Sequence, residues 1–115
     1  MIAVIFEVEP NEGCKQQYLE IAASLRSELE DIDGFISVER FQSLTDKNKI
    51  LSLSFFENEE AVERWRKLQT HRKAQSVGRS KIFKNYRIRV AKTLRDYSMV
   101  ERKQVPKDSA LIHDK

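Results

Sequence analysis

Hydrophobic positions recur along the first third of the chain with two different periods. Residues 2–8 alternate with a period of two, and both faces of this segment carry apolar side chains near its middle. That pattern favours an inner strand of a sheet. An apolar stripe at spacings of three and four then predicts a long amphipathic helix. It comprises Cys14, Tyr18, Ile21, Leu25, Leu29 and Ile32. We expect Asn11 to cap the start of this helix and Gly34 to provide its left-handed end.

A hairpin is predicted next. Residues 35–42 alternate in part and residues 50–56 alternate cleanly, while the polar residues 45–49 between them are typical of a turn. In the second strand the apolar face is formed by Leu51, Leu53 and Phe55. Its other face carries the small polar side chains of Ser52 and Ser54, which suit either contact with solvent or the lining of a cavity.

The second half of the chain predicts another helix and a final strand. Asn58 followed by two glutamates marks a helix start. Apolar residues at helical spacing continue through Trp65 towards Gly78, where we expect the helix to be interrupted or to end. The last strand alternates, with one face formed by Tyr86, Ile88, Val90, Lys92 and Leu94. From about residue 98 the chain turns polar, and from Pro106 onward we expect a loose tail.

The order strand-helix-strand-strand-helix-strand has one common solution, the ferredoxin-like split β-α-β arrangement. The sequence therefore predicts an α+β fold with a four-stranded antiparallel sheet and both helices on one face. Helices cover only that face, yet both faces of the strands carry apolar residues. An uncovered apolar face on a small domain indicates a partner surface, and the simplest partner is a second copy related by two-fold symmetry. We therefore expect a homodimer packed sheet against sheet.

Composition narrows the class of protein. The chain has 115 residues, 40% of them hydrophobic and 34% charged, which suits one folded domain and excludes a disordered chain. No apolar run reaches the ~20 residues of a membrane helix, and the first residues lack the basic lead of a secretory signal. We therefore expect a cytoplasmic protein that does not bind membranes. The single cysteine, Cys14, and two histidines 42 residues apart argue against a disulfide and against a metal site.

Charge is distributed unevenly. Residues 1–57 have a net charge of −6 and residues 58–115 one of +9, and the segment 64–103 holds 14 basic and only 2 acidic residues. A block of this kind can bind nucleic acid or another anion. The alternative is that the acidic half neutralises the basic half, within the fold or across a dimer. We favour the alternative, because the basic residues fall singly along a strand pattern and no cluster of aromatic residues accompanies them.

Several segments, taken in order, carry a resemblance to a known family. They are Gly34-Phe35 at the start of the second strand, residues 51–57 leading into 58–61, Trp65 six residues before His71, and the closing strand 86–91. Together they resemble the antibiotic biosynthesis monooxygenase family of dimeric α/β barrels. The similarity covers residues 1–97, which we expect to form the domain. Residues 98–115 then form a polar tail that either extends onto the partner subunit or is mobile.

The resemblance implies a cofactor-independent monooxygenase that oxidises small aromatic or quinol-type molecules with molecular oxygen. The substrate anion supplies the electrons in such a reaction. The site therefore needs a dry apolar cavity, a group that takes the phenolic proton and a cation that holds the anion. His71 suits the base, because imidazole exchanges protons near neutral pH, and Arg72 or Arg87 suits the cation. We expect the cavity to be walled by Phe6, Phe55, Trp65, Phe83 and Tyr86.

Each of these residues also has a structural interpretation. Trp65 on an apolar helical stripe suits a core position, which is compatible with a cavity wall. His71 beside Arg72 suits a surface or capping position. Arg87 on a strand suits an ion pair with the acidic half or with the other subunit, and His113 lies in the tail.

Two further functions stay open beside the monooxygenase. One is a non-catalytic dimeric protein that binds a ligand, and the other is a nucleic-acid binder that uses the basic segment 64–103. A haem-degrading branch of the same superfamily has an Asn on the first strand and a His ten residues after the Trp. Here Phe6 stands near the first position and Gln75 at the second. This argues against haem breakdown and leaves haem or another flat ligand open.

Overall fold

Strands and helices follow one another in the predicted order. In this computed structural model the backbone is described for residues 1–75 and 82–113, and the side chains for these residues apart from 69–75 and 113. The elements are β1 (Ile2–Pro10), α1 (Lys15–Glu30), β2 (Phe35–Gln42), β3 (Ile50–Phe56), α2 (Glu59–Gln75), β4 (Phe83–Lys92) and α3 (Lys107–His113). They confirm the predicted α+β fold class.

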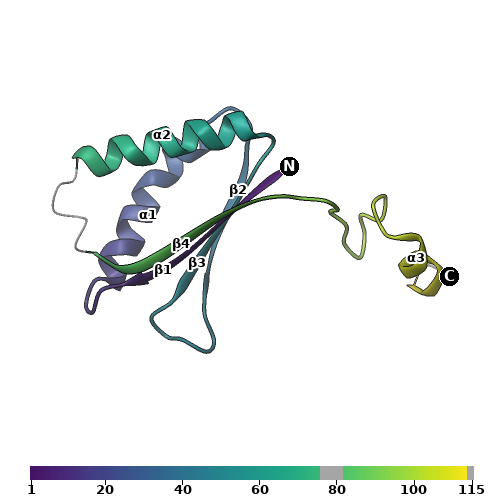
Figure 1. Cartoon of the computed structure of the whole chain (residues 1–115), viewed down its shortest axis with the longest axis horizontal. Coiled ribbons are helices and arrows are strands. Elements are labelled where there is room, and N and C mark those ends of the chain that lie inside the picture. Colours follow the sequence, from purple (N-terminus) through teal and green to yellow (C-terminus); the bar gives the residue numbers. More distant parts are fainter. Residues whose placement is uncertain (76–81, 114–115) are drawn as a thin grey trace.

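The four strands form one antiparallel sheet in the order β2-β3-β1-β4. α1 and α2 lie on the same side of this sheet, as the split β-α-β arrangement requires (Figure 1). The other side carries no helix of the part of the chain that the structure describes, so it is called the open face below. β2 and β4 are the two edge strands.

The strand register determines which side chains meet the helices. Directly paired residues of neighbouring strands share a face. Two rows on the helix side matter for the site: the first consists of Arg40, Ser52, Phe6 and Ile88, and the second of Val38, Ser54, Val4 and Val90. Because consecutive residues of a strand point to opposite faces, Ile5, Leu53 and Phe55 lie on the open face.

A bulge at the start of β2 changes its alternation. The pairing with β3 shifts register between Phe35 and Ser37, which leaves Ile36 as the extra residue. Ile36 is 46% exposed, whereas Phe35 packs against the core and Val38 is 8% exposed. Beyond the bulge, even-numbered positions of β2 therefore face the helices, and Arg40 is one of them.

The ends of α1 differ from the prediction. The residue before the helix is Cys14, which caps it without a side-chain hydrogen bond. Asn11 instead lies before a turn at residues 12–13 and donates its backbone N–H to the carbonyl of Ile82 (2.6 Å), so its expected capping role is wrong. The helix ends at Glu30, and Gly34 follows with a positive φ of 89°. A Cβ at Gly34 would lie 2.9 Å from Cβ of Ala61, so glycine also permits the close approach of α2.

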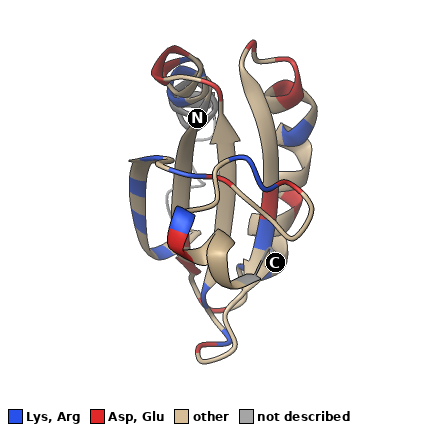
Figure 2. Ribbon diagram, turned by 90° about the vertical axis from the view of Figure 1, so that its right-hand side faces the viewer, with Lys and Arg blue, Asp and Glu red and all other residues tan. Residues whose placement is uncertain are grey.

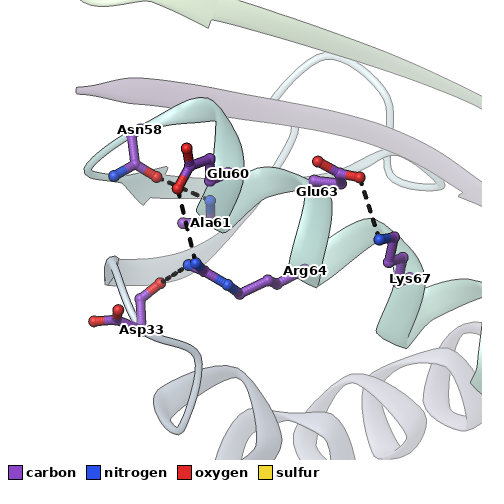
Figure 3. A network of polar contacts seen from close by, with 7 residues as sticks. All are labelled: Asp33, Asn58, Glu60, Ala61, Glu63, Arg64 and Lys67. Carbon is purple, nitrogen blue, oxygen red and sulfur yellow. Dashed lines mark hydrogen bonds and ion pairs between the residues drawn. The ribbon is translucent and has the colours of Figure 1, made fainter.

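The start of α2 is held by polar contacts, which Figure 3 shows. The predicted cap is confirmed, because Oδ1 of Asn58 accepts the backbone N–H of Ala61 (2.9 Å). One turn later, Nη1 of Arg64 donates to the carbonyl of Asp33 (3.0 Å) in the turn before β2. These contacts orient the helix so that Trp65 is directed at the sheet and is 9% exposed. α2 continues through Gln75 without a break, whereas the break expected at Gly78 lies outside the described residues.

Two separate clusters form the core. The first contains Ile2, Val4, Leu29, Val38, Phe56, Ala61, Val62 and Trp65. The second contains Val8, Tyr18, Ala22, Ile50 and Ile82, with Phe6 and Phe83 packed against it. Helix α1 contributes to both, so the two clusters lie under the same helical layer at different positions along it. The space between them is the site described next.

The C-terminal arm leaves the end of β4 and projects away from the sheet (Figure 1). Its first residue, Thr93, donates its backbone N–H to the carbonyl of Met1 (2.9 Å), but Leu94 and Met99 are 82% and 95% exposed. The loose tail expected from Pro106 onward is wrong in one respect, because α3 begins at Lys107.

Candidate functional site

A cavity of about 150 Å³ lies between the sheet and the two long helices. Its apolar lining consists of Val4, Phe6, Ile21, Ala22, Leu25, Leu29, Val38, Trp65, Phe83 and Ile88, and its polar lining of Tyr18, Arg40, Ser52, Ser54, Arg66 and Tyr86. Residues of both core clusters contribute, so the cavity separates the two clusters. A dry protein cavity of about this size accommodates benzene.

The small residues of β3 explain why a hollow exists here. Ser52 and Ser54 lie at the centre of the two helix-facing rows and are buried. A larger side chain at either position would fill the space beneath the helices. The sequence left two interpretations of these serines open, and the structure selects the lining of a cavity.

Aromatic rings gather on the side of the cavity that belongs to the second cluster. Phe6 contacts Phe83 and Tyr86 edge-on, with ring centroids 6.2 and 5.8 Å apart. Phe83 also contacts Tyr18 at 5.8 Å. On the opposite side the indole of Trp65 lies 6.3 Å from the ring of Phe56. A flat apolar ligand between these groups would contact rings on both sides.

Two arginines, Arg40 and Arg66, line this largely apolar cavity, and Arg40 is the one with an enclosed nitrogen. Arg40 points from β2 to the helix side, and its Nε is buried without a hydrogen-bond partner in the described part of the chain. Burial raises the pKa of the Tyr18 phenol above its ordinary value of 10. Arg40 opposes part of this rise through its charge and a hydrogen bond, so the two side chains are neighbours.

Four of the residues expected at the site line the cavity: Phe6, Trp65, Phe83 and Tyr86. Phe55 does not, because it pairs with Ala3 and lies on the open face. Arg87 pairs with Glu7 on the same open face, so the structure corrects its expected position beside the ligand. His71 and Arg72 belong to α2, but their side chains lie outside the described residues.

Sequence reasoning did not identify Arg40 or Tyr18 as site residues. Tyr18 was assigned to the apolar stripe of the first helix, where a phenol is not distinguished from packing. Arg40 stands among polar residues in a strand that alternates only in part, and the bulge between Phe35 and Ser37 hides which face it takes. The available signal was its spacing of two from Val38, which is buried.

The basic segment 64–103 is spread over α2, β4 and the arm rather than gathered in one groove. The edge strand β4 carries Lys and Arg without Asp or Glu, whereas both signs of charge occur on α2 and in the arm (Figure 2). On the open face Nη1 of Arg89 lies 3.3 Å from Oε1 of Glu7, which joins the basic half to the acidic half. Such an exposed pair contributes little free energy, but its position agrees with neutralisation within the fold.

Other kinds of site find no support in the described residues. Over residues 1–68 and 82–112, whose side chains the structure describes, no three His, Cys, Asp or Glu side chains gather closely enough to hold a metal ion. Within the same residues, every helix is too short or too polar to cross a bilayer.

Comparison with known proteins agrees with the fold and adds a family. The model of the antibiotic biosynthesis monooxygenase family matches residues 1–77. A fungal protein from Pyricularia oryzae named jasmonate monooxygenase ABM is 44% identical over 105 residues, which cover 91% of this chain and 49% of that protein. The chain therefore spans about half the length of this curated relative.

Solved structures with low sequence identity share the fold. Rv0793 from Mycobacterium tuberculosis superposes with a TM-score of 0.71 at 14% identity, covering 84% of this chain and 98% of that one. A MhuD variant with two manganese protoporphyrin IX molecules bound per active site gives 0.68 at 14% identity, covering 85% and 99%. At this identity the likeness concerns the fold alone.

Proposed function

Because the chain belongs to the antibiotic biosynthesis monooxygenase family, we propose that it is a cofactor-independent monooxygenase of small ring-containing molecules, with quinols as the model substrates. The observation that supports this most is the cavity between the sheet and the helices. It is apolar over most of its lining, it has a volume of about 150 Å³, and it is bordered by Trp65 on one side and by Phe6, Phe83 and Tyr86 on the other.

The proposed reaction needs no electron donor besides the substrate. A naphthoquinol that reacts with one molecule of oxygen gives a hydroxynaphthoquinone and one molecule of water. One oxygen atom forms a bond to a ring carbon in place of hydrogen. The other leaves as water, and the ring supplies all four electrons. What the protein contributes is desolvation, orientation and transfer of the quinol proton.

Specific roles follow for the residues around the cavity. Trp65 and the three aromatic residues opposite it hold the ring by stacking and edge contacts. His71 is proposed as the base that removes the quinol proton, and Arg72 as a cation near the resulting anion. Both residues belong to α2, the helix whose Trp65 and Arg66 side chains line the cavity.

Oxygen consumption tests the proposal. Wild-type protein should accelerate oxygen uptake by a reduced naphthoquinol above the rate in buffer, and Trp65→Phe and His71→Ala should each lower that acceleration by at least about tenfold. Arg95→Met, in the exposed arm, is the matched surface control and should leave the rate unchanged. Acceleration that survives in both site variants would remove the proposed site.

The name of the fungal relative supplies a second substrate for the same assay. Jasmonate should be tested beside the quinols, with the product identified by mass spectrometry. Because this chain covers only 49% of that protein, the substrate of the relative is a hypothesis for this chain. Conversion of jasmonate by the wild type and not by Trp65→Phe would favour it.

Haem fits the cavity poorly. The haem macrocycle is far larger than a quinol, and the cavity here has only about 150 Å³. Phe6 also occupies the cavity side of β1 where the haem-degrading branch has Asn. We therefore include no step through a porphyrin, and a non-catalytic role in binding a smaller ligand is the outcome that ligand binding without oxygen uptake would indicate.

We also propose that the protein is a homodimer packed through the open face. Ile5 and Leu53 pair directly there, Phe55 follows two positions further along β3, and all three are only partly buried by the chain itself. Sedimentation should give about 27 kDa, twice the 13.5 kDa of one chain. A species of one chain at micromolar concentration would contradict the dimer.

A further inference from the structure

Arg40 is a charged residue of the cavity lining, and its hydrogen bonding is incomplete. Its Nε is fully enclosed and lacks a partner within the described residues. A guanidinium has five N–H donors in a fixed plane and no acceptor. Enclosing one of these donors without an acceptor is unfavourable, so the position is one that an acceptor from outside the chain would stabilise.

The charge of Arg40 is not neutralised by the surrounding lining. Among the described residues that line the cavity, Arg40 and Arg66 are charged and neither Asp nor Glu is present. Beyond the lining, too, Arg40 forms no ion pair with a carboxylate of the described residues. A cation held in apolar surroundings without a counter-charge attracts an anion more strongly than an exposed one does.

Tyr18 supplies a second donor at the same place. Tyr18 belongs to α1, neighbours Arg40 of β2 and is 5% exposed. Since burial raises the pKa of this phenol, Tyr18 stays protonated at neutral pH and its O–H is available to a ligand. The oxygen of the same phenol accepts from Arg40, which leaves the hydrogen free to point at a third group.

From these contacts we propose that Arg40 and Tyr18 form an anion-binding end of the cavity, and that the substrate is a ring-containing carboxylic acid. Nε–H and one Nη–H of a guanidinium match the two oxygens of a carboxylate in geometry, and the Tyr18 O–H donates a further hydrogen bond. The ring then lies in the apolar remainder towards Trp65. This inference rests on the proposed function in one respect, since it takes the same cavity as the ligand site.

The carboxylate of the substrate serves in binding only and takes no part in the oxidation. No bond is made or broken at Arg40, and the electrons for oxygen still come from the ring. Arg40 is therefore a residue that determines specificity rather than a catalytic residue. It should select acids over neutral molecules of the same shape, whichever ring is oxidised.

A pair of probes tests this selection without any turnover. We choose 3-phenylpropionate and its amide, 3-phenylpropionamide, which have nearly the same shape and differ in charge at neutral pH. Trp65 is the single tryptophan of the chain and lines the cavity, so its fluorescence reports binding. In the wild type the acid should bind at least about tenfold more tightly than the amide, because hydrogen bonds to a charged group are the stronger ones.

Variants then assign the selection to Arg40. Arg40→Met keeps an unbranched side chain without the charge or the N–H donors and should reduce the preference to less than about twofold, through weaker binding of the acid. Arg40→Lys retains a charge without the paired donors and should give an intermediate preference. Arg95→Met, on the exposed arm, should retain the full preference. Circular dichroism of each variant controls for folding.

Clear outcomes overturn the inference. If the wild type binds acid and amide with equal affinity, the inference is wrong. It is also wrong if the acid gives no saturable change in fluorescence. A preference for the acid that persists in folded Arg40→Met would likewise contradict the inference. The proposed oxygenase is judged separately: selective acid binding with no oxygen uptake from any ring would refute the activity and leave this site standing. Oxygen uptake without a preference for the acid would support the activity and refute the anion-binding site.

Discussion

The two faces of the sheet carry apolar side chains of similar kind, but these side chains differ in how far the chain itself buries them. On the helix side Val4, Val8 and Phe56 are almost completely enclosed by the chain's own helices. On the open face Ile5, Leu53 and Phe55 remain partly accessible. The covered face is also the one that is incompletely packed, because Ser52 and Ser54 leave a cavity beneath the helices. In our proposal, ligand binding therefore belongs to the covered face, together with the core, and self-association to the open face.

Adjacent phenylalanines allow the sharpest test of this difference. Phe56 is 0% exposed and packs on Phe35 and Trp65, so Phe56→Ala should lower the free energy of unfolding by about 3–5 kcal/mol. Phe55→Ala removes the same group from the open face. It should lower the apparent stability by less, and only in proportion to its effect on the dimer. Urea unfolding followed at several protein concentrations measures both.

The concentration series separates the two effects. Loss of stability in Phe56→Ala should be nearly the same at every concentration, whereas the loss in Phe55→Ala should be smallest in dilute protein and should grow with concentration as the wild type dimerises. If the two variants lost the same stability independently of concentration, the distinction between the faces would not hold.

A charge in the middle of the open face should separate the subunits. Leu53 lies between Ile5 of β1 and Glu39 of β2 in the register, so Leu53→Glu places a carboxylate at the proposed interface. We expect the dissociation constant of the dimer to rise by about two orders of magnitude or more, because an unpaired charge would be desolvated there. Sedimentation equilibrium would then give about 13.5 kDa at micromolar concentration. A variant that sediments like the wild type would locate the interface elsewhere.

Removing the cap of α2 should affect the covered face more mildly. Asn58→Ala leaves the backbone N–H of Ala61 without its acceptor and should lower the free energy of unfolding by about 1 kcal/mol. Thermal unfolding measures this change, and Asn58→Asp, which retains an acceptor at the cap, should restore most of it. A loss of several kcal/mol would show that Asn58 does more than cap the helix.

The smallest effect concerns the alkaline limit of stability. Tyr18 has a folded pKa above its ordinary value of 10, so the unfolded chain loses this proton first as the pH rises. The contribution of Tyr18 is therefore complete below pH 10 and decreases as the pH approaches its folded pKa. Tyr18→Phe should show a shallower loss of stability above pH 10 than the wild type, measured by urea unfolding at each pH. Parallel slopes for the two proteins would contradict the burial of this phenol.

Much of the fold could be predicted from period-two and helical patterns alone. β2 and β3 coincide with residues 35–42 and 50–56, because alternation and a polar turn specify a hairpin locally. The N-cap at Asn58 was equally local. The capping role expected of Asn11 failed because a turn at residues 12–13, with Gly13 at a φ of 79°, delays the start of the helix to Lys15.

The site was predicted only in part. Phe6, Trp65, Phe83 and Tyr86 could be assigned to a cavity because each is a large apolar residue on a core-facing position. Phe55 was assigned with them, although the register that pairs Phe6 with Ser52 turns Phe55 to the open face. Strand register depends on pairing between distant segments.

Arg40 was not predicted as a site residue because a bulge precedes it in β2. The extra residue Ile36 reverses the alternation of β2, so the polar segment that follows resembles a solvent-exposed strand. Only the paired structure shows that Arg40 lies in the same row as Ser52 and Phe6. The cation sought at Arg87 was therefore present in the cavity, but on the opposite edge strand.

Isotope labelling of the product tests the central claim most directly. Wild-type protein and a reduced naphthoquinol are incubated under ¹⁸O₂, and the products are analysed by mass spectrometry beside a reaction that contains Trp65→Ala. We predict a hydroxynaphthoquinone with one heavy oxygen atom, formed faster with the wild type than in buffer and at the buffer rate with Trp65→Ala. A labelled product formed equally fast with both proteins, or no labelled product at all, would contradict oxygen insertion in this cavity.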